Sequence, residues 1–426
     1  MAVYSSNQHC VAKLLDLSET HSIVATQDIY DEQGFKLLAK GAEVSRDMQD
    51  RLLLRKLRAP LESSLSVRDG LTVAEILQGA LELVDQNPAL ESIAGTRAAR
   101  EILRDGRDLH IPPPLMLLMT CVRHTSADSF RHTQVVAALC AGIAADLEAS
   151  AAEARTLLVA SILHDIGEIY VNPDYITRQG HLSPQEWKHV ATHPRVGELL
   201  IRGLTSMPQG VLACVAQHHE RHDGSGYPAR LTRKEQHDLS GWMAVADSAA
   251  ALINRGNSGA SQVSLALRIV PKEFDRSAAD VLIRGLQRLK VAPQLPSDTK
   301  CVDRAHRLLA HIEAVGSALQ AEAGKALSNP LVEIVGRALY LLDGFARSLR
   351  STGILDASSL SGADASDQGL LEEMQQIVNE VTWRMRNLGR NIYLGVDACN
   401  DPAASEGMQA IIEMLDTAAQ PDTAVG

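Results

Sequence analysis

HHERHDGSGYP, residues 218–228, and LLVASILHDIGE, residues 157–168, are the two stretches that decide the fold and chemistry expected of this chain. Adjacent histidines, acidic residues and a Gly-rich turn are typical of a multi-metal site, because imidazole and carboxylate groups bind divalent transition metals. The second stretch is an apolar helical run that carries His164 and Asp165 into the interior. A buried aspartate without a cation or donors is costly. The pattern therefore fits a hydrolase that cuts phosphodiester bonds with bound metal, and a hydrogen-bonded His-Asp pair without metal is the structural alternative.

The composition predicts a mainly α-helical protein. Hydrophobic residues make up 45% of the 426 residues, whereas aromatic residues make up only 3%. The core must therefore consist mostly of Leu, Ala, Val and Ile, which favours helices over sheets. A chain of this length is expected to form two or three domains.

The net charge indicates which partners the protein can bind, and the cysteines indicate the compartment in which it is found. The net charge of −11 argues against binding to nucleic-acid polymers, so an anionic substrate would need a local source of positive charge such as metal ions. The 6 cysteines are scattered without a CxxC pair, which fits a reducing cytoplasm. No secretory signal and no membrane-spanning stretch are recognisable, so we expect a cytoplasmic protein that does not enter a membrane.

Four segments are expected along the chain. Residues 1–70 have short apolar runs broken by Gly-containing turns, which predicts a small β-rich module with a helix near 46–57. Residues 71–110 form a helical linker, and the Pro-rich 111–114 stretch starts the next domain, 111–295, a series of helices. Residues 296–426 contain long amphipathic helices. That last region carries no visible chemistry and is expected to serve packing or homodimerisation.

Histidines are concentrated in the central segment, where eight of the 15 lie between 164 and 237. A two-metal phosphodiesterase needs a carboxylate that bridges two cations, several neutral imidazoles and an open position for hydroxide. Asp165 is the best candidate for the bridge and for the catalytic residue. This donor set suits iron or manganese better than calcium.

These motifs resemble the HD-GYP family of cyclic di-GMP phosphodiesterases, a branch of the HD phosphohydrolases. The resemblance covers roughly residues 120–290. It rests on HDIG at 164–167, HPRVG at 193–197, the 218–228 segment and AVAD at 244–247. It implies an all-helical domain and the metal ligands His132, His164, Asp165, His193, His218, His219 and Asp247.

The resemblance also implies a mechanism, a cofactor and partners. Two divalent ions, with a third as an alternative, share a hydroxide that attacks phosphorus in line, and cyclic di-GMP is cut to pGpG or GMP. Asp128, four residues before His132, is an extra candidate for a third metal. The Gly-Tyr-Pro turn, Gly224–Pro228, contains the motif residues Gly226, Tyr227 and Pro228. We expect Tyr227 and Pro228 to form an exposed knob that contacts substrate or GGDEF-domain partner proteins, or simply a turn that orients the next helix.

Three departures from the family pattern concern substrate binding. The family has lysine after HDIG, where this chain has Glu168. One charge pair at 4 Å is worth about 4 kcal/mol at an effective dielectric of 20, so a glutamate that faces the substrate phosphate would weaken substrate binding. After Asp247, Arg255 matches the substrate-binding arginine. In the same stretch Ala250 replaces the second aspartate, Gly256-Asn257 replaces Pro-Tyr, and the lysine is missing. Gly241 stands where an arginine is usual.

These departures leave alternatives to an active cyclic di-GMP phosphodiesterase. A catalytically silent regulatory module would bind metal, nucleotide and GGDEF-type proteins without hydrolysis. An active enzyme in which the residues that hold the substrate phosphates are altered would hydrolyse another cyclic dinucleotide or nucleotide.

Overall fold

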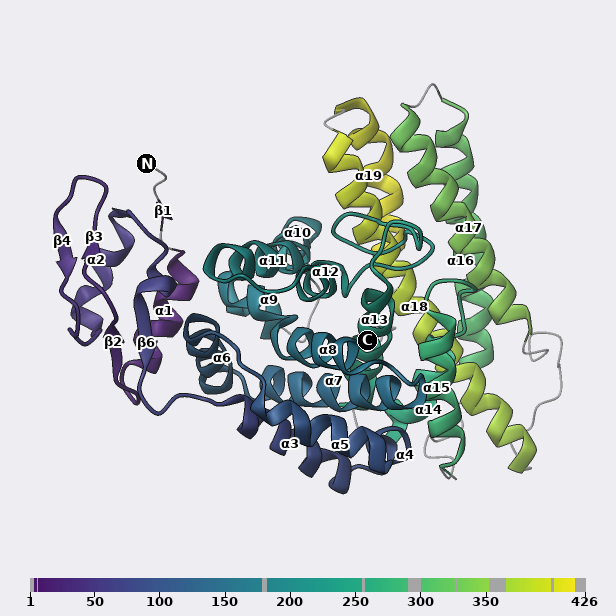
Figure 1. The fold of residues 1–426 in the computed structure, drawn as a ribbon. Helices are drawn as coiled ribbons and strands as arrows, with labels where there is room; N and C mark the ends of the chain where they lie inside the picture. The colour runs from purple at the N-terminus through teal and green to yellow at the C-terminus, as the bar shows by residue number, and fades with distance from the viewer. Residues whose placement is uncertain are drawn as a thin grey trace.

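The computed structural model describes residues 4–5, 7–177, 182–254, 257–289, 300–325, 328–351, 365–399 and 402–417. Most of them lie in helices, so the prediction of a mainly α protein is confirmed. Figure 1 shows three parts in a row: a small module with the strands, a central group of helices, and a C-terminal group of long helices. Within the described residues, no helix is both long and apolar enough to cross a bilayer.

The N-terminal module contains short antiparallel strand pairs around one amphipathic helix. The pairs are β1 (Tyr4–Ser5) with β5 (Lys56–Leu57), β2 (Ile23–Ala25) with β6 (Leu65–Val67), and β3 (Ile29–Tyr30) with β4 (Lys36–Leu38). Helix α1 (Gln8–Leu17) starts at Asn7, whose side chain accepts hydrogen bonds from two backbone amides. The helix expected near 46–57 is shorter and consists of a 3-10 turn, Arg46–Met48, and α2 (Gln49–Leu53).

The central helices surround α7 (Ala127–Asp146), which is buried along most of its length. Its sequence from Val135 onward, VVAALCAGIAA, is apolar on every face, as expected of a helix enclosed by others. Helices of the central part that pack against it include α3 (Val73–Gln86), α4 (Pro88–Ala94), α5 (Arg97–Asp105), α6 (Pro113–Thr125), α8 (Ala151–Leu163), α13 (Asp238–Ile253) and α15 (Arg276–Gln287). The remaining central helices are α9 (Pro173–Thr177), α10 (Pro184–Ala191), α11 (His193–Leu204), α12 (Gln209–Gln217) and α14 (Asn257–Ala266).

One hydrophobic core runs through the first two parts of the molecule. It includes Cys10 and Leu14 of α1, Leu77 of α3 and Leu282 of α15. The N-terminal module and the helices of residues 71–110 therefore share a core with the following helices, and the boundaries at residues 70, 110 and 295 remain predictions.

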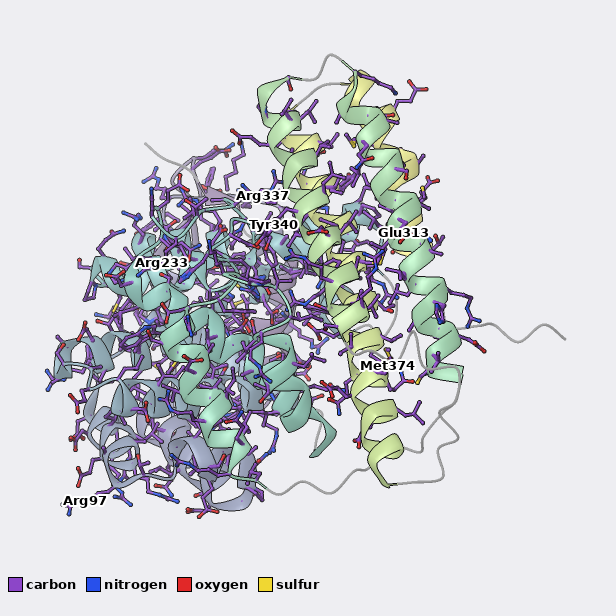
Figure 2. The ribbon with its side chains drawn as sticks, turned by 90° about the vertical axis from the view of Figure 1, so that its right-hand side faces the viewer. Arg97, Arg233, Glu313, Arg337, Tyr340 and Met374 are labelled. Carbon is purple, nitrogen blue, oxygen red and sulfur yellow. The ribbon has the colours of Figure 1, made fainter. Side chains whose placement is uncertain are left out.

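The C-terminal part is a bundle of α16 (Lys300–Ala323), α17 (Asn329–Ser351), α18 (Ala365–Cys399) and α19 (Pro402–Thr417) with a core of its own. The bundle stands along one side of the central helices (Figures 1 and 2). Arg384 of α18 is buried at the boundary, where it forms an ion pair with Glu273 at 2.6 Å and donates to the Ala266 carbonyl at 2.7 Å. On α17, the Arg337 guanidinium lies against Gly224. Homodimerisation through these helices remains a prediction.

Candidate metal centre and adjoining cavities

The seven predicted ligands come together at the ends and in the middle of central helices. His132 lies on α7, and Asp247 lies on α13. His164 and Asp165 follow the last residue of α8, His193 begins α11, and His218 and His219 follow α12. Six of them form two groups that could hold a metal ion: Asp165, His193, His218 and His219; and His132, His164 and Asp165. Asp247 is in neither group and contacts their histidines from α13.

Gly167 allows the helix ends that carry these ligands to approach each other. A Cβ atom at this position would lie 2.1 Å from the His193 carbonyl oxygen and 2.8 Å from the Gly197 amide nitrogen. Those distances are below any real contact, so only glycine fits between the HDIG turn and α11. The close approach sets the His193 imidazole beside Asp165.

Asp165 presents its two carboxylate oxygens to different histidines. Oδ1 lies 3.3 Å from Nε2 of His193 and 3.4 Å from Nε2 of His218. Oδ2 lies 2.9 Å from Nε2 of His164 and 3.9 Å from Nε2 of His132. This is the arrangement of a carboxylate that bridges two cations, each oxygen facing a separate set of imidazoles.

Asp247 connects the same two sides of the cluster from α13. Its Oδ1 lies 3.0 Å from Nε2 of His132 and 3.8 Å from Nε2 of His164, while Oδ2 lies 3.3 Å from Nδ1 of His219. The neighbouring histidines, chiefly His219 and His132, hold the pKa of the Asp247 carboxyl well below its ordinary value although burial opposes ionisation. Both cluster aspartates are therefore in the ionised form that binds cations, since the pKa of Asp165 is lowered in the same way by His164.

Backbone carbonyls fix the orientation of three of the imidazoles. Nδ1 of His164 lies 2.9 Å from the Ser161 carbonyl, Nδ1 of His193 lies 2.8 Å from that of Val190, and Nδ1 of His218 lies 2.7 Å from that of Val215. Each carbonyl can only accept, so each Nδ1 carries a proton, and Nε2 is the ring nitrogen that faces the cluster. A hydrogen bond of this kind to the second nitrogen is the usual support of a metal-binding histidine.

The resulting donor set fits divalent transition ions. Nε2 of His193 and Nε2 of His218 face each other at 3.1 Å, and Oδ1 of Asp165 lies 3.3 Å from the first and 3.4 Å from the second. A cation bound between these atoms would contact all three of them at once. Nε2 of His164 is buried and lies 2.9 Å from Oδ2 of Asp165. Imidazole and carboxylate together suit transition ions better than calcium, so the residues of the cluster could hold such an ion.

Glu168 lies beside the cluster and is not part of either ligand group. Burial, followed by repulsion from Asp165, raises the pKa of its carboxyl to about 7. Lys13 of α1 donates a hydrogen bond from Nζ to the Glu168 backbone carbonyl at 3.2 Å. Lys13, Glu168 and Asp165 all line a small cavity of about 60 Å³, so a cation from the N-terminal module lies next to the position where the family has its lysine. Asp128 is exposed and belongs to neither ligand group.

The Gly-Tyr-Pro turn folds onto the metal cluster. A Cβ atom on Gly226 would lie 2.4 Å from the His219 carbonyl, to which the Tyr227 amide donates at 3.1 Å. The Tyr227 ring lies 4.7 Å from the His219 ring and 5.4 Å from the Trp187 ring, measured between centroids. Tyr227 is therefore not the exposed knob that was expected, because these contacts leave its side chain only partly exposed; Pro228 is exposed.

A second, larger cavity of about 540 Å³ opens beside the cluster. His219 and Asp247 reach it from the metal centre, and Gly226 and Tyr227 form part of its wall. Tyr227 thus lies where a substrate-binding residue would be expected. Arg255, the other predicted substrate contact, lies outside the described residues.

Helix α18 forms the opposite wall of this large cavity, and the sequence did not indicate that role. Its lining residues, Trp383, Asn387 and Arg390 among them, follow helical spacing and belong to no recognisable motif. Lys13 was missed for the same reason. The only sequence signal was the absence of the lysines with which the family binds substrate phosphates. A positive charge for this purpose must then come from elsewhere in the chain.

Comparison with known proteins agrees with the geometry of the cluster. Residues 117–280 match the HD domain family. The protein carries an HD domain of the HD-GYP family. All seven ligand candidates lie within the matched residues, and α16 to α19 lie outside them.

Three curated relatives illustrate the similarity of this HD-GYP domain. Cyclic di-GMP phosphodiesterase response regulator RpfG of Xanthomonas campestris is 34% identical, and the match covers 35% of this chain and 41% of that protein. A cyclic di-GMP phosphodiesterase of Thermotoga maritima is 33% identical, covering 33% and 39%. The 3'3'-cGAMP-specific phosphodiesterase 2 of Vibrio cholerae is 35% identical, covering 27% and 22%. The chain thus spans less than half the length of each of these relatives.

Proposed function

We propose that this protein is a metal-dependent phosphodiesterase that hydrolyses cyclic di-GMP to pGpG, GMP or both. The observation that carries the proposal is the position of Asp165, with one oxygen toward His193 and His218 and the other toward His164 and His132. Relatives that are named cyclic di-GMP phosphodiesterases match the same part of the chain.

Different residues would bind the metal ions and the substrate. His132, His164, His193, His218, His219, Asp165 and Asp247 would hold two divalent ions, with iron or manganese as the proposed metals and a third ion as an alternative. Bound ions of this kind activate water and neutralise charge on phosphate oxygens. His219 and Asp247 border the large cavity, so the scissile phosphate would enter there. Burial raises the pKa of the Tyr227 phenol well above its ordinary value, so its hydroxyl stays protonated and can donate to a phosphate oxygen.

Hydrolysis of 3'3'-cGAMP is the second candidate function. Relatives named 3'3'-cGAMP-specific phosphodiesterases match this chain at 35% and 27% identity, in the same range as the cyclic di-GMP enzymes. The metal cluster acts on the phosphodiester group that both molecules share, so discrimination would depend on contacts between the cavity and the bases.

A silent regulatory module is the remaining alternative, and Glu168 is the feature that favours it. An acidic side chain beside Asp165 disfavours phosphate binding when it is ionised. Such a module would bind metal and nucleotide and contact GGDEF-domain proteins. Pro228 is the exposed residue of the turn that such a partner could reach, whereas the Tyr227 ring packs against the rings of Trp187 and His219.

The test combines metal content and turnover on one preparation. The purified protein loaded with Mn²⁺ or Fe²⁺ is expected to hydrolyse cyclic di-GMP, and parallel rates with 3'3'-cGAMP decide the preferred substrate. Asp165→Ala is expected to abolish turnover and to lower the metal content, because both ligand groups contain this residue. His110→Ala, which removes an exposed imidazole far along the chain from the cluster, is the matched control and is expected to leave both unchanged.

Full metal occupancy without hydrolysis of either cyclic dinucleotide would contradict the enzymatic function and favour the silent module. Unchanged metal content in Asp165→Ala would contradict the bridging role of this carboxylate. Equal rates on both substrates would remove the preference for cyclic di-GMP while leaving the phosphodiesterase activity in place.

A further inference from the structure

The large cavity has walls from two distant parts of the chain. One wall belongs to the HD domain and includes the ligand candidates His219 and Asp247 together with the Gly-Tyr-Pro turn. The other wall is α18, more than a hundred residues later in the sequence. The volume of about 540 Å³ falls within the range of about 300–1,000 Å³ of small-molecule sites. The C-terminal bundle therefore closes a site that begins at the metal centre.

Helix α18 is held against the turn by specific polar contacts. The Asn391 side chain donates to the Ser225 carbonyl at 2.7 Å, and Arg230 donates to the Asn391 carbonyl at 3.3 Å. Near the end of α18, Asp397 forms an ion pair with Lys188 of α10 at 2.6 Å. These bonds fix the register of α18 relative to the turn, so the residues of its inner face have defined positions in the cavity.

Arg390 is the cation on this wall that lacks an anionic partner. Its guanidinium lies 4.6 Å from the centre of the Trp187 ring, and its Nε is buried without a hydrogen-bond partner. Within the ranges that the structure describes, no carboxylate forms an ion pair with it, and its polar contact is with Asn387 Oδ1 at 3.4 Å. Arg384 in the same cavity differs, because Glu273 and Glu380 neutralise it at 2.6 and 2.7 Å. An anionic ligand in the cavity would therefore meet Arg390 as the available positive charge of α18, in addition to Arg221, which lies 3.8 Å from Glu273.

The surroundings of Arg390 match the remaining chemistry of a nucleotide. Trp383 is an exposed aromatic ring on the same wall, and aromatic rings stack on nucleobases. Asn387, one turn from Trp383, offers an amide with donors and an acceptor that suit a base edge. The buried Trp187 indole nitrogen is a further donor without a partner. A cation, an aromatic ring and an amide thus line the same cavity as the ligand candidates His219 and Asp247.

We infer that α18 forms the second half of a cyclic dinucleotide site, in which Arg390 binds the phosphate that is not being cut and Trp383 packs against a base. This inference rests on the proposed function for the identity of the ligand. It assigns a substrate-binding role to helices outside the HD domain. It also provides a cation for a chain in which the lysine of the usual clamp is absent.

The experiment compares a large and a small substrate with the full-length, metal-loaded protein. Arg390→Ala is expected to raise KM for cyclic di-GMP about ten- to hundredfold, as for the loss of a charge-assisted contact. It should leave kcat/KM for bis(4-nitrophenyl) phosphate within about twofold, because this substrate has no second phosphate and no base. Arg390→Lys should recover most of the affinity for cyclic di-GMP. Trp383→Phe should bind cyclic di-GMP more tightly than Trp383→Ala. Arg347→Ala on α17, outside the cavity, is the matched arginine control.

Direct binding of cyclic di-GMP to the same variants by calorimetry separates the inference from the proposed function. Hydrolysis by the wild type with an unchanged KM in Arg390→Ala would overturn the inference and leave the function standing. Binding that depends on Arg390 without any turnover would sustain the inference and overturn the function. Equal losses on both substrates would show that Arg390 supports the metal centre or the fold, and would overturn the inference. Absence of both binding and hydrolysis in the wild type would overturn both.

Discussion

Gly167 and Asp165 show how single residues determine this site. Asp165 faces imidazoles through both oxygens, which is possible only because α11 approaches the HDIG turn closely enough to bring His193 beside it. The approach depends on the missing side chain of Gly167, since the His193 carbonyl occupies the space of a Cβ atom. The glycine of the motif is thus required by packing, and the aspartate by its two oxygens.

Gly167→Ala is expected to destabilise the protein by about 1–3 kcal/mol, because the added methyl group forces α11 away from the turn. The same displacement moves His193, so metal content should fall as well. Gly203→Ala is the matched control on α11: a Cβ there meets nothing within 4 Å, and alanine in a helix is favoured over glycine by about 0.5–1 kcal/mol. Urea denaturation and metal analysis of both variants provide the measurements. Equal stability of the two variants would show that the close approach is relaxed in solution.

Glu168→Gln is expected to stabilise the metal-free protein at pH 8 by about 1–3 kcal/mol and to have little effect near pH 4. The folded-state pKa of Glu168 is raised to about 7 by burial and by Asp165, above the ordinary value of 4.5. Below pH 4.5 the carboxyl is protonated in both states. As the pH rises from 4.5 to 7, the unfolded chain ionises first, so the wild type loses stability that the amide variant keeps. Urea denaturation in chelator across this range measures the difference, and a difference that does not vary with pH would contradict the assignment.

At the scale of elements, the sequence predicted the segments that carry ligand candidates better than it predicted the helices that pack around them. The apolar run before His164 and the short spacings within HDIG, HPRVG and AVAD are local signals, so they identified ligand candidates that the fold then brings together. The position of Tyr227 was wrong because its burial depends on Trp187 of α10, a contact that no local pattern encodes. The cavity wall of α18 was missed for the same reason. An amphipathic pattern shows that a helix has an inner face, but it does not show which part of the chain that face meets.

The ion pair between Arg384 and Glu273 attaches α18 to the central helices, and its loss is expected to cost about 3–5 kcal/mol. Both side chains are buried, so Arg384→Ala leaves the Glu273 carboxylate without its partner at 2.6 Å. Arg347→Ala breaks an exposed pair with Asp343 and should cost less than about 1 kcal/mol. Chemical denaturation of the two variants measures both effects. Similar small decreases in the free energy of unfolding of the two variants would indicate that water reaches the Glu273 carboxylate.

At the scale of the whole molecule, metal occupancy and stability should be linked. The ligand candidates come from α7, α8, α11, α12 and α13, so the centre exists only when these helices are packed together. A ligand that binds only the folded state stabilises it by about 2.7 kcal/mol at a free concentration 100 times its Kd.

Removal of metal by a chelator is therefore expected to lower the melting temperature, and added Mn²⁺ should restore it. Differential scanning calorimetry of the wild type and of Asp165→Ala tests this link. The variant lacks the residue common to both ligand groups, so its melting temperature should respond little to Mn²⁺. An equal rise in both proteins would indicate that Mn²⁺ binds elsewhere.

The order in which the two walls of the large cavity occur in the chain has a consequence during synthesis. Every ligand candidate precedes residue 248, whereas Arg390 follows Asp247 by roughly 140 residues, which a ribosome adding ~5–20 residues per second needs about 10–30 s to produce. The helices that carry the ligands emerge first and can fold as a unit before α18 exists. A nascent chain can thus acquire its metal ions while the cavity is still open on one side, and the α18 wall is added afterwards.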